Sequence, residues 1–449
     1  MYAGPLPRKG YLMFSHPNWL KRAQGTGFVL FAASAAFLTY FSMYAFRKPF
    51  TANSYTEFDD PSWQVSFKIA LILAQVFGYL CAKFIGIKVI SEMQHQQRGL
   101  TIIGLIAAAE ISLVLFAITP IGLNVIWLFF NGLSLGMIWG LVFSFLEGRK
   151  TSEILGAILS VTFILASGLV RSVGKWLIDT LNVPELWMPA ATGALFFPLL
   201  LFSVKCLTLI PEPTAEDEQA RQKRLPMDGK ARWQFFKQYW FGISCLILSF
   251  MLFTGFRDFR DNFAAEIWQA LGHGEEPAIF AYAGIRMSFI VLIALGAMVL
   301  VKNNKTAFYV NHGFILFGAA LLLSSTFAFE ANLISAKAWM VLLGSGLYIS
   351  YIPYNCFLFD RMISAVGSVA NAGFLIYLAD SAGYLGSVSI LLYRTFAMPE
   401  LSWLNFFINA CYLVGIVAAA LVACSLCYFT VRLSPIRTHH PKQVVTCNN

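Results

Sequence analysis

Two arginines occupy equivalent places in a repeated sequence pattern, Phe-Arg-x-x-Phe-x-Ala. Arg47 lies in the first copy, residues 46–52, at the end of the first long apolar segment. Arg260 lies in the second copy, residues 259–265, at the end of the first apolar segment of the second half. A guanidinium group offers two parallel N–H donors and keeps its charge at any working pH, which suits a phosphate, sulfate or carboxylate. Two such groups facing each other predict an anion-binding site.

Arg257 precedes Arg260 by about one helical turn and is a further candidate. A charge at the centre of a bilayer costs about 2.5–3.5 kcal/mol, so an arginine within a span normally faces the bundle interior or a watery cavity. We therefore expect Arg47, Arg257 and Arg260 to point inward. In the alternative, Arg257 and Arg260 pair with the aspartates that follow them at the outer surface. Arg47 and Lys48 then extend to the lipid headgroups, because Pro49 ends their helix.

Other polar side chains lie within apolar segments. Asp380 is midway along one of them and is predicted to balance an arginine or carry a coupling proton, or else to form a fixed salt bridge between helices. Glu110 is a second candidate for charge balance, although a structural hydrogen-bonding role is favoured for it. Tyr348 and Tyr351 share one helix face, where their hydroxyls suit an organic substrate, although tyrosines at this spacing also serve packing.

The composition indicates a membrane protein. Of the 449 residues, 58% are hydrophobic and only 12% are charged, whereas about a quarter is charged in a typical soluble domain. Crossing the hydrocarbon takes roughly 20 mainly apolar residues. Twelve segments have this length: 26–48, 64–85, 99–119, 123–146, 154–174, 189–210, 239–259, 278–301, 307–328, 337–358, 366–392 and 403–430.

These segments predict two six-helix bundles, residues 26–210 and 239–430, joined by a linker at 211–238. With even-numbered spans, the N-terminal segment (1–25), the linker and the tail (431–449) lie on one side of the membrane. Lysine and arginine are more frequent on that side, which predicts that both termini are cytoplasmic. We also expect a multi-pass protein of the inner (plasma) membrane.

Several classes of function are not indicated. The eight cysteines lie mostly in apolar runs, so no disulfide framework is expected. No metal-ligand spacing, cofactor motif or nucleophile motif appears in the polar segments, and therefore no metal, cofactor or catalytic residue is predicted. We expect no nucleic-acid partner, and a monomer in contact with the lipid bilayer and a small anionic substrate.

The chain resembles the major facilitator superfamily, and within it the organophosphate:phosphate antiporters. The resemblance lies in residues 43–50, in Lys83 with the phenylalanine that follows it, in the basic loop 147–153 and in residues 282–285. The whole chain is also similar to an uncharacterised bacterial family of twelve-span membrane proteins. The fold class implied is an all-α integral membrane protein with twelve transmembrane helices in two pseudo-symmetric six-helix bundles, the major facilitator fold.

In the antiporters, one arginine from the first helix and one from the seventh bind phosphate. The resemblance implies this role for Arg47 and for either Arg257 or Arg260. The internal repeat favours Arg260, whereas the spacing of the antiporters' seventh helix favours Arg257. Lys83 is a secondary substrate-binding candidate.

These observations predict a secondary active transporter of a small organic anion, such as a phosphorylated metabolite, working by alternating access. One alternative is a transporter-like sensor or receptor that binds the ligand without moving it. The weaker alternative is an integral-membrane enzyme, since acids and histidines are scattered along the chain rather than gathered.

Overall fold

The computed structural model describes residues 25–147, 149, 151–212, 229–367 and 372–433. Residues 1–24, 213–228 and 434–449, which hold most of the predicted N-terminal segment, linker and tail, lie outside the described residues. The first half contains α2 (Thr26–Tyr44), α3 (Phe67–Glu92), α4 (His95–Ile118), α5 (Val125–Leu135), α6 (Ile138–Phe143), α7 (Ser152–Leu181) and α8 (Met188–Thr208). The second half contains α10 (Gly229–Asn262), α11 (Ala264–Ala270), α12 (Ile279–Val299), α13 (Asn304–Glu330), α14 (Ala336–Cys356), α15 (Leu358–Val366), α16 (Ala372–Leu392) and α17 (Trp403–Leu433). Short helical turns occur at η1 (Pro49–Ala52), η2 (Thr56–Phe58) and η3 (Tyr393–Ala397).

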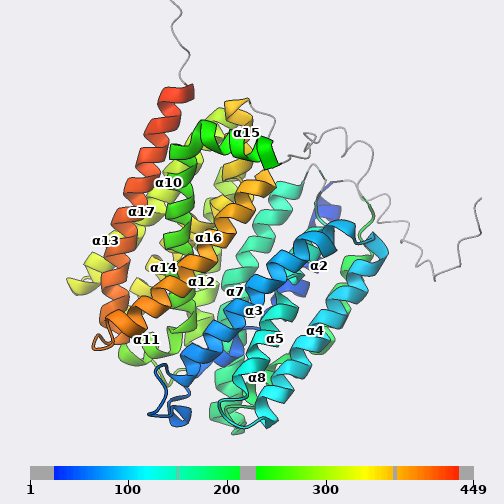
Figure 1. Cartoon of the computed structure of the whole chain (residues 1–449), viewed down its shortest axis with the longest axis vertical. Coiled ribbons are helices and arrows are strands. Elements are labelled where there is room, and N and C mark those ends of the chain that lie inside the picture. Colours follow the sequence, from blue (N-terminus) through cyan, green and yellow to red (C-terminus); the bar gives the residue numbers. More distant parts are fainter. Residues whose placement is uncertain (1–24, 148, 150, 213–228, 368–371, 434–449) are drawn as a thin grey trace, which may run out of the picture.

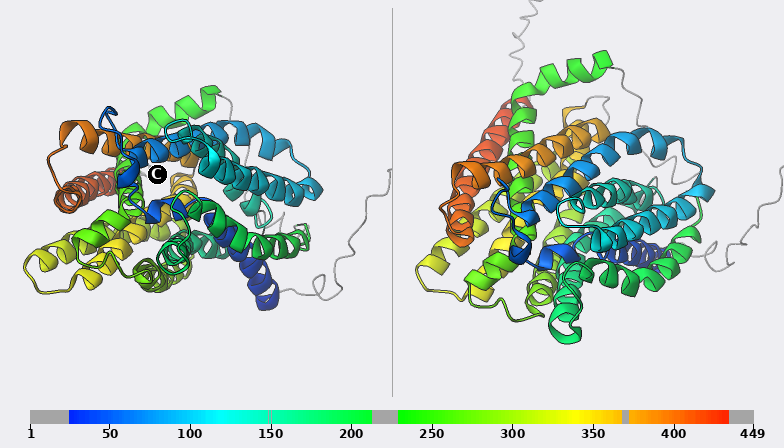
Figure 2. Two further views of the ribbon diagram at one scale, coloured as in Figure 1. Left: turned by 90° about the horizontal axis from the view of Figure 1, so that it is seen from below. Right: turned by 60° about the horizontal axis from the view of Figure 1, so that its bottom comes forward.

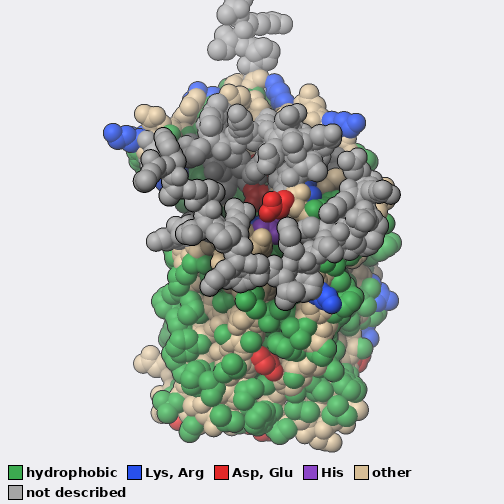
Figure 3. All heavy atoms as spheres, turned by 90° about the vertical axis from the view of Figure 1, so that its right-hand side faces the viewer, with side chains coloured by type: hydrophobic (Ala, Val, Ile, Leu, Met, Phe, Trp, Pro, Cys, Tyr) green, Lys and Arg blue, Asp and Glu red, His purple; other side chains and the backbone are tan. Residues whose placement is uncertain are grey.

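The helices match the predicted membrane architecture. Within the described ranges, eleven helical segments are long and apolar enough to cross a membrane, with α5 and α6 together forming one of them. Helices α14 and α15, which meet at a bend of 52°, form a twelfth segment if they are taken together. Figure 3 shows that the lower part of one face is mostly hydrophobic, while the visible lysines and arginines lie higher. The prediction of an all-helical membrane protein is confirmed.

The helices of the two halves form two groups, with α10–α17 on the left and α2–α8 on the right in Figure 1. Helices pack across the boundary, chiefly α7 against α12, with smaller contacts of α3 with α16 and of α7 with α14. The same division is visible from below in Figure 2. We call the end that carries α15 the α15 end and the opposite end, which carries η1 and α11, the α11 end.

Helix α2 ends at Tyr44, four residues before the predicted end of the first span. Pro49 explains this early end, because proline lacks an N–H donor and its ring clashes with the carbonyl group four residues earlier, that of Ala45. Two side chains satisfy carbonyl groups that the ending helix leaves free. Asn131 Nδ2 donates to the Phe46 carbonyl at 3.0 Å, and Gln75 Nε2 donates to the Arg47 carbonyl at 3.1 Å. These two hydrogen bonds lie within the first half and stabilise the chain where α2 ends.

Candidate functional site

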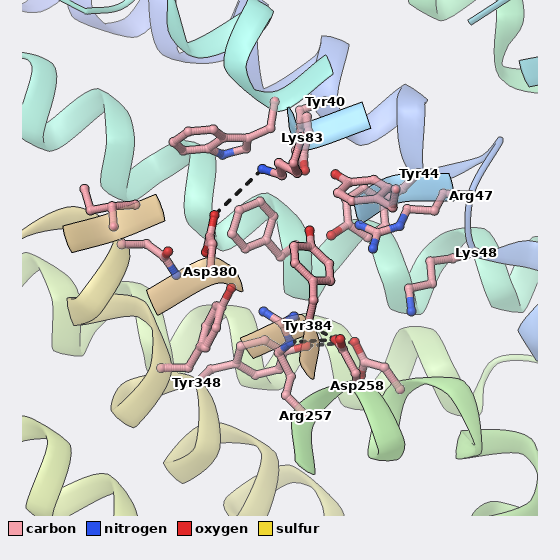
Figure 4. Close-up of a pocket in the computed structure, with 17 residues that line it drawn as sticks. Tyr40, Tyr44, Arg47, Lys48, Lys83, Arg257, Asp258, Tyr348, Asp380 and Tyr384 are labelled. Carbon is pink, nitrogen blue, oxygen red and sulfur yellow. Dashed lines mark hydrogen bonds and ion pairs between the residues drawn. The ribbon is translucent and has the colours of Figure 1, made fainter. Parts of the chain in front are cut away.

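A cavity of about 80 Å³ lies between the two halves, and we call it the central cavity (Figure 4). Four basic, three acidic and six tyrosine side chains contribute to its wall. The described lining residues are Tyr40, Tyr44, Arg47, Lys48, Tyr79, Lys83, Trp139, Phe163, Arg257, Asp258, Asp261, Tyr348, Tyr351, Asn355, Ile376, Asp380 and Tyr384. The cavity thus combines a small excess of positive charge with aromatic walls.

Two of the basic side chains have carboxylate partners. Arg257 Nη2 lies 2.7 Å from Asp258 Oδ1, and the Arg257 guanidinium stands 4.0 Å from the centre of the Tyr351 ring. Lys83 Nζ lies 3.8 Å from Asp380 Oδ2. Both pairs are drawn as dashed lines in Figure 4. Since Lys83 belongs to α3 and Asp380 to α16, the second pair joins the two halves across the cavity.

Arg47 differs from these two residues, because it forms no ion pair with any described carboxylate. Its guanidinium carbon lies 4.2 Å from the centre of the Tyr79 ring and 5.8 Å from that of Tyr44. Its Nε is buried and has no hydrogen-bond partner among the described residues. Aromatic faces attract a cation but offer no oxygen acceptor for its N–H groups. Arg47 therefore presents unused donors and an unbalanced charge to the cavity.

Arg260 does not line the central cavity. It is only 3% exposed and lies beside Met287 and Met340 of α12 and α14. There Nη2 donates to the Met340 carbonyl at 3.1 Å, and Nη1 lies 3.4 Å from Asp261 Oδ1. The structure therefore brings Arg257, rather than the repeat-related Arg260, to the cavity that Arg47 lines. The alternative of surface pairing holds in part: both arginines pair with the next aspartate, but inside the protein and not at its outer surface.

The other predicted site residues divide into two groups. Lys83, Tyr348, Tyr351 and Asp380 line the central cavity, whereas Glu110 does not. A side chain on Gly193 of α8 would clash with Glu110, which places this carboxylate between α4 and α8. Asp380 forms a salt bridge between helices with Lys83, and its role in charge balance or proton coupling stays a prediction.

Sequence reasoning assigned no binding role to several residues that line the cavity. Asp258 was expected only to pair with Arg257 at the outer surface, and Lys48 was expected only to reach the lipid headgroups. Lys48 is instead buried, and its Nζ donates to Asn262 Oδ1 at 2.8 Å. Tyr79 precedes Lys83 by four residues and Tyr384 follows Asp380 by four, so helical spacing from the two predicted residues could have found both tyrosines.

A second cavity, of about 250 Å³, continues from the first toward the α15 end, and we call it the entry cavity. The two cavities share Lys83, Trp139, Asn355, Ile376 and Asp380. Beyond these residues, the entry cavity reaches Glu147 and Ser152, near the start of α7, and Asp360 in α15. The central cavity is thus continued by space on its α15 side.

Polar contacts join the halves at the α11 end. Lys68 Nζ forms an ion pair of 2.6 Å with Glu266 Oε1, and Arg171 Nη1 donates to the Asp261 carbonyl at 2.6 Å. Together with the contact from Lys48, which precedes η1, they connect α3 and α7 of the first half with α10 and α11 of the second. The α11 end is closed in this conformation.

As for other ligands, the described residues contain no group of three or more His, Cys, Asp or Glu side chains suited to a metal ion.

The chain is similar in structure to solved transporters. A D-xylose–proton symporter matches with a TM-score of 0.57 and 14% identity, covering 89% of this chain and 96% of that chain. The xylose transporter XylE from E. coli, in a partially occluded inward-open conformation, gives a TM-score of 0.56 at 14% identity, covering 91% and 98%. A POT family transporter in complex with a thioalcohol-conjugated peptide gives 0.53 at 13% identity, covering 94% and 98%.

These likenesses confirm the major facilitator fold. The closer resemblance to organophosphate antiporters stays a prediction, and no curated protein matches the sequence. The model of one sequence family, described as a family of unknown function (DUF5690), matches residues 49–432. Since this match spans most of the 449 residues, the chain belongs to the DUF5690 family.

Proposed function

We propose that the protein is a secondary active transporter that binds a small organic anion in the central cavity and moves it across the membrane by alternating access. The observation that carries this proposal is Arg47, a cavity-lining cation without a carboxylate partner among the described residues. An arginine in this state is poised to bind an oxyanion through two parallel hydrogen bonds. The printed descriptions of the similar structures, a proton-coupled xylose symporter and a POT family transporter, support transport as the class of function.

Arg257 is the proposed second arginine of the clamp. It faces the same cavity, and its pairing with Asp258 holds it in place when no substrate is bound. Lys83 would contribute a third positive charge once the substrate displaces Asp380 from it. Asp380 then either remains ionised or takes up a coupling proton. Tyr348 and Tyr351 are proposed to hold the uncharged part of the substrate, and Glu110 to have a structural role.

The conformation supports alternating access. Polar contacts close the α11 end, while the entry cavity continues toward the α15 end. We propose that the α15 end is cytoplasmic, because the lysine and arginine bias favours this orientation. We also propose that the membrane is the plasma (inner) membrane. One chain encloses the whole cavity, which supports action as a monomer. A phosphorylated metabolite fits the charge pattern, and so does a carboxylate.

Ligand screening followed by transport tests this proposal. A thermal-shift screen of the purified protein against phosphate esters, carboxylates and sugars identifies a ligand, because binding to the native state raises its apparent stability. Uptake of the labelled ligand into proteoliposomes is then measured for Arg47→Ala and Arg47→Lys. Losing one partner of a buried charged contact costs about 2–5 kcal/mol, so uptake by Arg47→Ala should fall by roughly thirtyfold or more.

Arg286→Ala is the matched control, because Arg286 is an exposed arginine of α12 that stacks on Tyr282 at 3.6 Å and lines neither cavity. Its uptake should equal that of the wild type. Undiminished uptake by both Arg47 variants would contradict a binding role for Arg47. Ligand binding without flux would favour the receptor alternative, and a ligand-dependent product without movement would favour the enzyme.

A further inference from the structure

Besides Arg47, two further residues in the cavity walls carry a hydrogen-bond donor without an acceptor. Trp139 Nε1, in α6, and Asn355 Nδ2, in α14, are both buried and lack a hydrogen-bond partner among the described residues. Trp139 and Asn355 come from opposite halves, and both line the central cavity as well as the entry cavity. The unpartnered donors therefore lie where the two cavities meet.

Buried N–H groups nearly always have a hydrogen-bond acceptor in native proteins, so two buried donors without one require an explanation. Other indoles of this chain follow the rule. Trp127 Nε1 donates to Thr119 Oγ1 at 2.8 Å, and Trp339 Nε1 donates to Thr326 Oγ1 at 3.1 Å. Trp139 departs from the rule at a cavity wall, which is where a ligand could supply the missing acceptor.

The surroundings of these donors suit the body of an organic molecule. The Trp139 ring stacks on Phe143 with ring centres 5.0 Å apart and an angle of 7° between the planes, which forms a flat apolar wall. Lys83 and Asp380 bind each other at the same junction. The entry cavity, at about 250 Å³, is roughly three times the volume of the central one. A single oxyanion beside Arg47 would leave this space, and both donors, unused.

We propose that the substrate is an elongated organic anion whose second end accepts hydrogen bonds from Trp139 and Asn355. This inference rests on the proposed function, because it takes the anionic end to lie beside Arg47 and Arg257. The body then extends past Lys83 and Asp380 into the entry cavity. A hydroxyl, carbonyl or second carboxylate on the body would satisfy the two donors. Trp139 and Asn355 thus determine specificity, since a buried site that donates hydrogen bonds discriminates strongly against analogues without an acceptor.

The test compares matched probes that differ only in acceptors on the body. Binding to the purified full chain is measured by isothermal titration for ribose 5-phosphate against pentyl phosphate, and for ribonate against pentanoate, with inorganic phosphate as a fifth probe. In the wild type, the polyhydroxylated member of at least one pair should bind about tenfold tighter or more. Trp139→Phe, which keeps an aromatic ring, and Asn355→Leu, which keeps the approximate size, should each reduce this ratio, and the double variant should bring it close to one.

Trp127→Phe is the matched control, because Trp127 lines neither cavity and its indole N–H already has an acceptor. It should leave the ratio unchanged. Size-exclusion profiles and ligand-free melting temperatures establish that each variant folds. The inference is overturned if the wild type does not prefer the polyhydroxylated member of either pair, or if the double variant retains the preference.

The same titrations separate this inference from the proposed function. Arg47→Ala should abolish binding of every anionic probe, whereas the double variant of Trp139 and Asn355 should leave binding of inorganic phosphate unchanged. In one outcome, Arg47→Ala abolishes binding but the double variant still prefers the polyhydroxylated probes. This result would overturn only the proposed contacts of Trp139 and Asn355 with the second end of the substrate. Binding that survives in Arg47→Ala would overturn the anion site itself.

Discussion

The charge of Arg47 is held by aromatic rings, whereas every other cation of the central cavity has a polar partner. Arg257 pairs with Asp258, Lys83 with Asp380, and Lys48 donates to Asn262. A guanidinium on a tyrosine face is stabilised without losing its N–H donors to a carboxylate. The arrangement keeps one arginine of the cavity available for a ligand.

The two arginines at the end of α10 predict different mutant effects. Arg257→Lys should lower the affinity for the anion by about tenfold or more, because lysine cannot reproduce a bidentate contact or the same stacking on Tyr351. Arg260→Lys should leave the affinity unchanged but lower the melting temperature, because the contact with the Met340 carbonyl is buried. Titration and thermal unfolding of both variants check this. Equal loss of affinity in the two variants would restore Arg260 as a binding candidate.

At the scale of elements, glycines let helices of this protein approach closely. A Cβ on Gly132 of α5 would lie 2.1 Å from the Gln75 carbonyl of α3, within the first half. A Cβ on Gly168 of α7 would lie 2.4 Å from the Phe280 carbonyl of α12, across the boundary between the halves. Small residues at such crossings are typical of membrane helix packing. The second crossing is part of the surface that must rearrange if the two halves move.

Gly168→Ala tests this crossing. The added methyl group cannot fit against backbone, so we expect a destabilisation of about 1–3 kcal/mol, seen as a lower melting temperature. Gly313→Ala in α13 is the matched control, since a Cβ there has nothing within 4 Å. It should be neutral or stabilising by up to about 1 kcal/mol, the helix propensity of alanine over glycine. Equal melting temperatures for the two variants would contradict the close approach of α7 and α12.

At the scale of the whole molecule, the contacts between halves are unevenly distributed. Lys68 and Glu266 form a tight ion pair at the α11 end, and Lys68 is only 2% exposed. Breaking a buried pair by removing one partner leaves an uncompensated charge and costs about 3–5 kcal/mol. This is enough to shift a balance between two conformations that differ by a few kcal/mol. We therefore expect the pair to act as a latch that favours the conformation described.

Lys68→Gln and Glu266→Gln should open the α11 end. The measurement is the distance between spin labels at Leu123 and Leu333, two exposed loop residues of the first and second halves, with the native cysteines replaced. Each single variant should shift the distribution to longer distances. The exchange of charges, Lys68→Glu with Glu266→Lys, should restore the wild-type distribution in part.

A second lysine–glutamate pair provides the control for this experiment. Lys337 Nζ lies 2.8 Å from Glu276 Oε2, and both residues belong to the second half. Hydrogen bonds from Lys337 and His273 lower the pKa of Glu276, which favours its charged carboxylate. Lys337→Gln should not alter the label distances. Unchanged distances in the Lys68 and Glu266 variants would show that the ion pair is not a latch.

The sequence alone determined the elements and their class. Spans of apolar residues predict membrane helices because hydrocarbon tolerates only backbones whose hydrogen bonds are satisfied within the helix. The repeated pattern, with cations inside the spans, predicted a major facilitator fold and an inward-facing Arg47. Membrane helices and inward-facing charges depend on local composition and on the preference of apolar side chains for hydrocarbon and of charged ones for a polar environment. They can therefore be recognised without knowing the packing. Arg47 and Asp380 could be selected as candidates for the same reason, whereas Lys83 was selected through the resemblance to the antiporters.

Only the tertiary structure decided which charges meet. The repeat treats Arg47 and Arg260 as equivalents, but Pro49 ends α2 early, whereas α10 continues helically to Asn262. The same pattern therefore leaves one arginine facing the cavity and turns the other against Met340. The pairing of Asp380 with Lys83, and the orphaned donors of Trp139 and Asn355, depend on helices that meet only when the two halves pack. Ion pairs and cavities are set by such long-range contacts, which the local sequence does not encode.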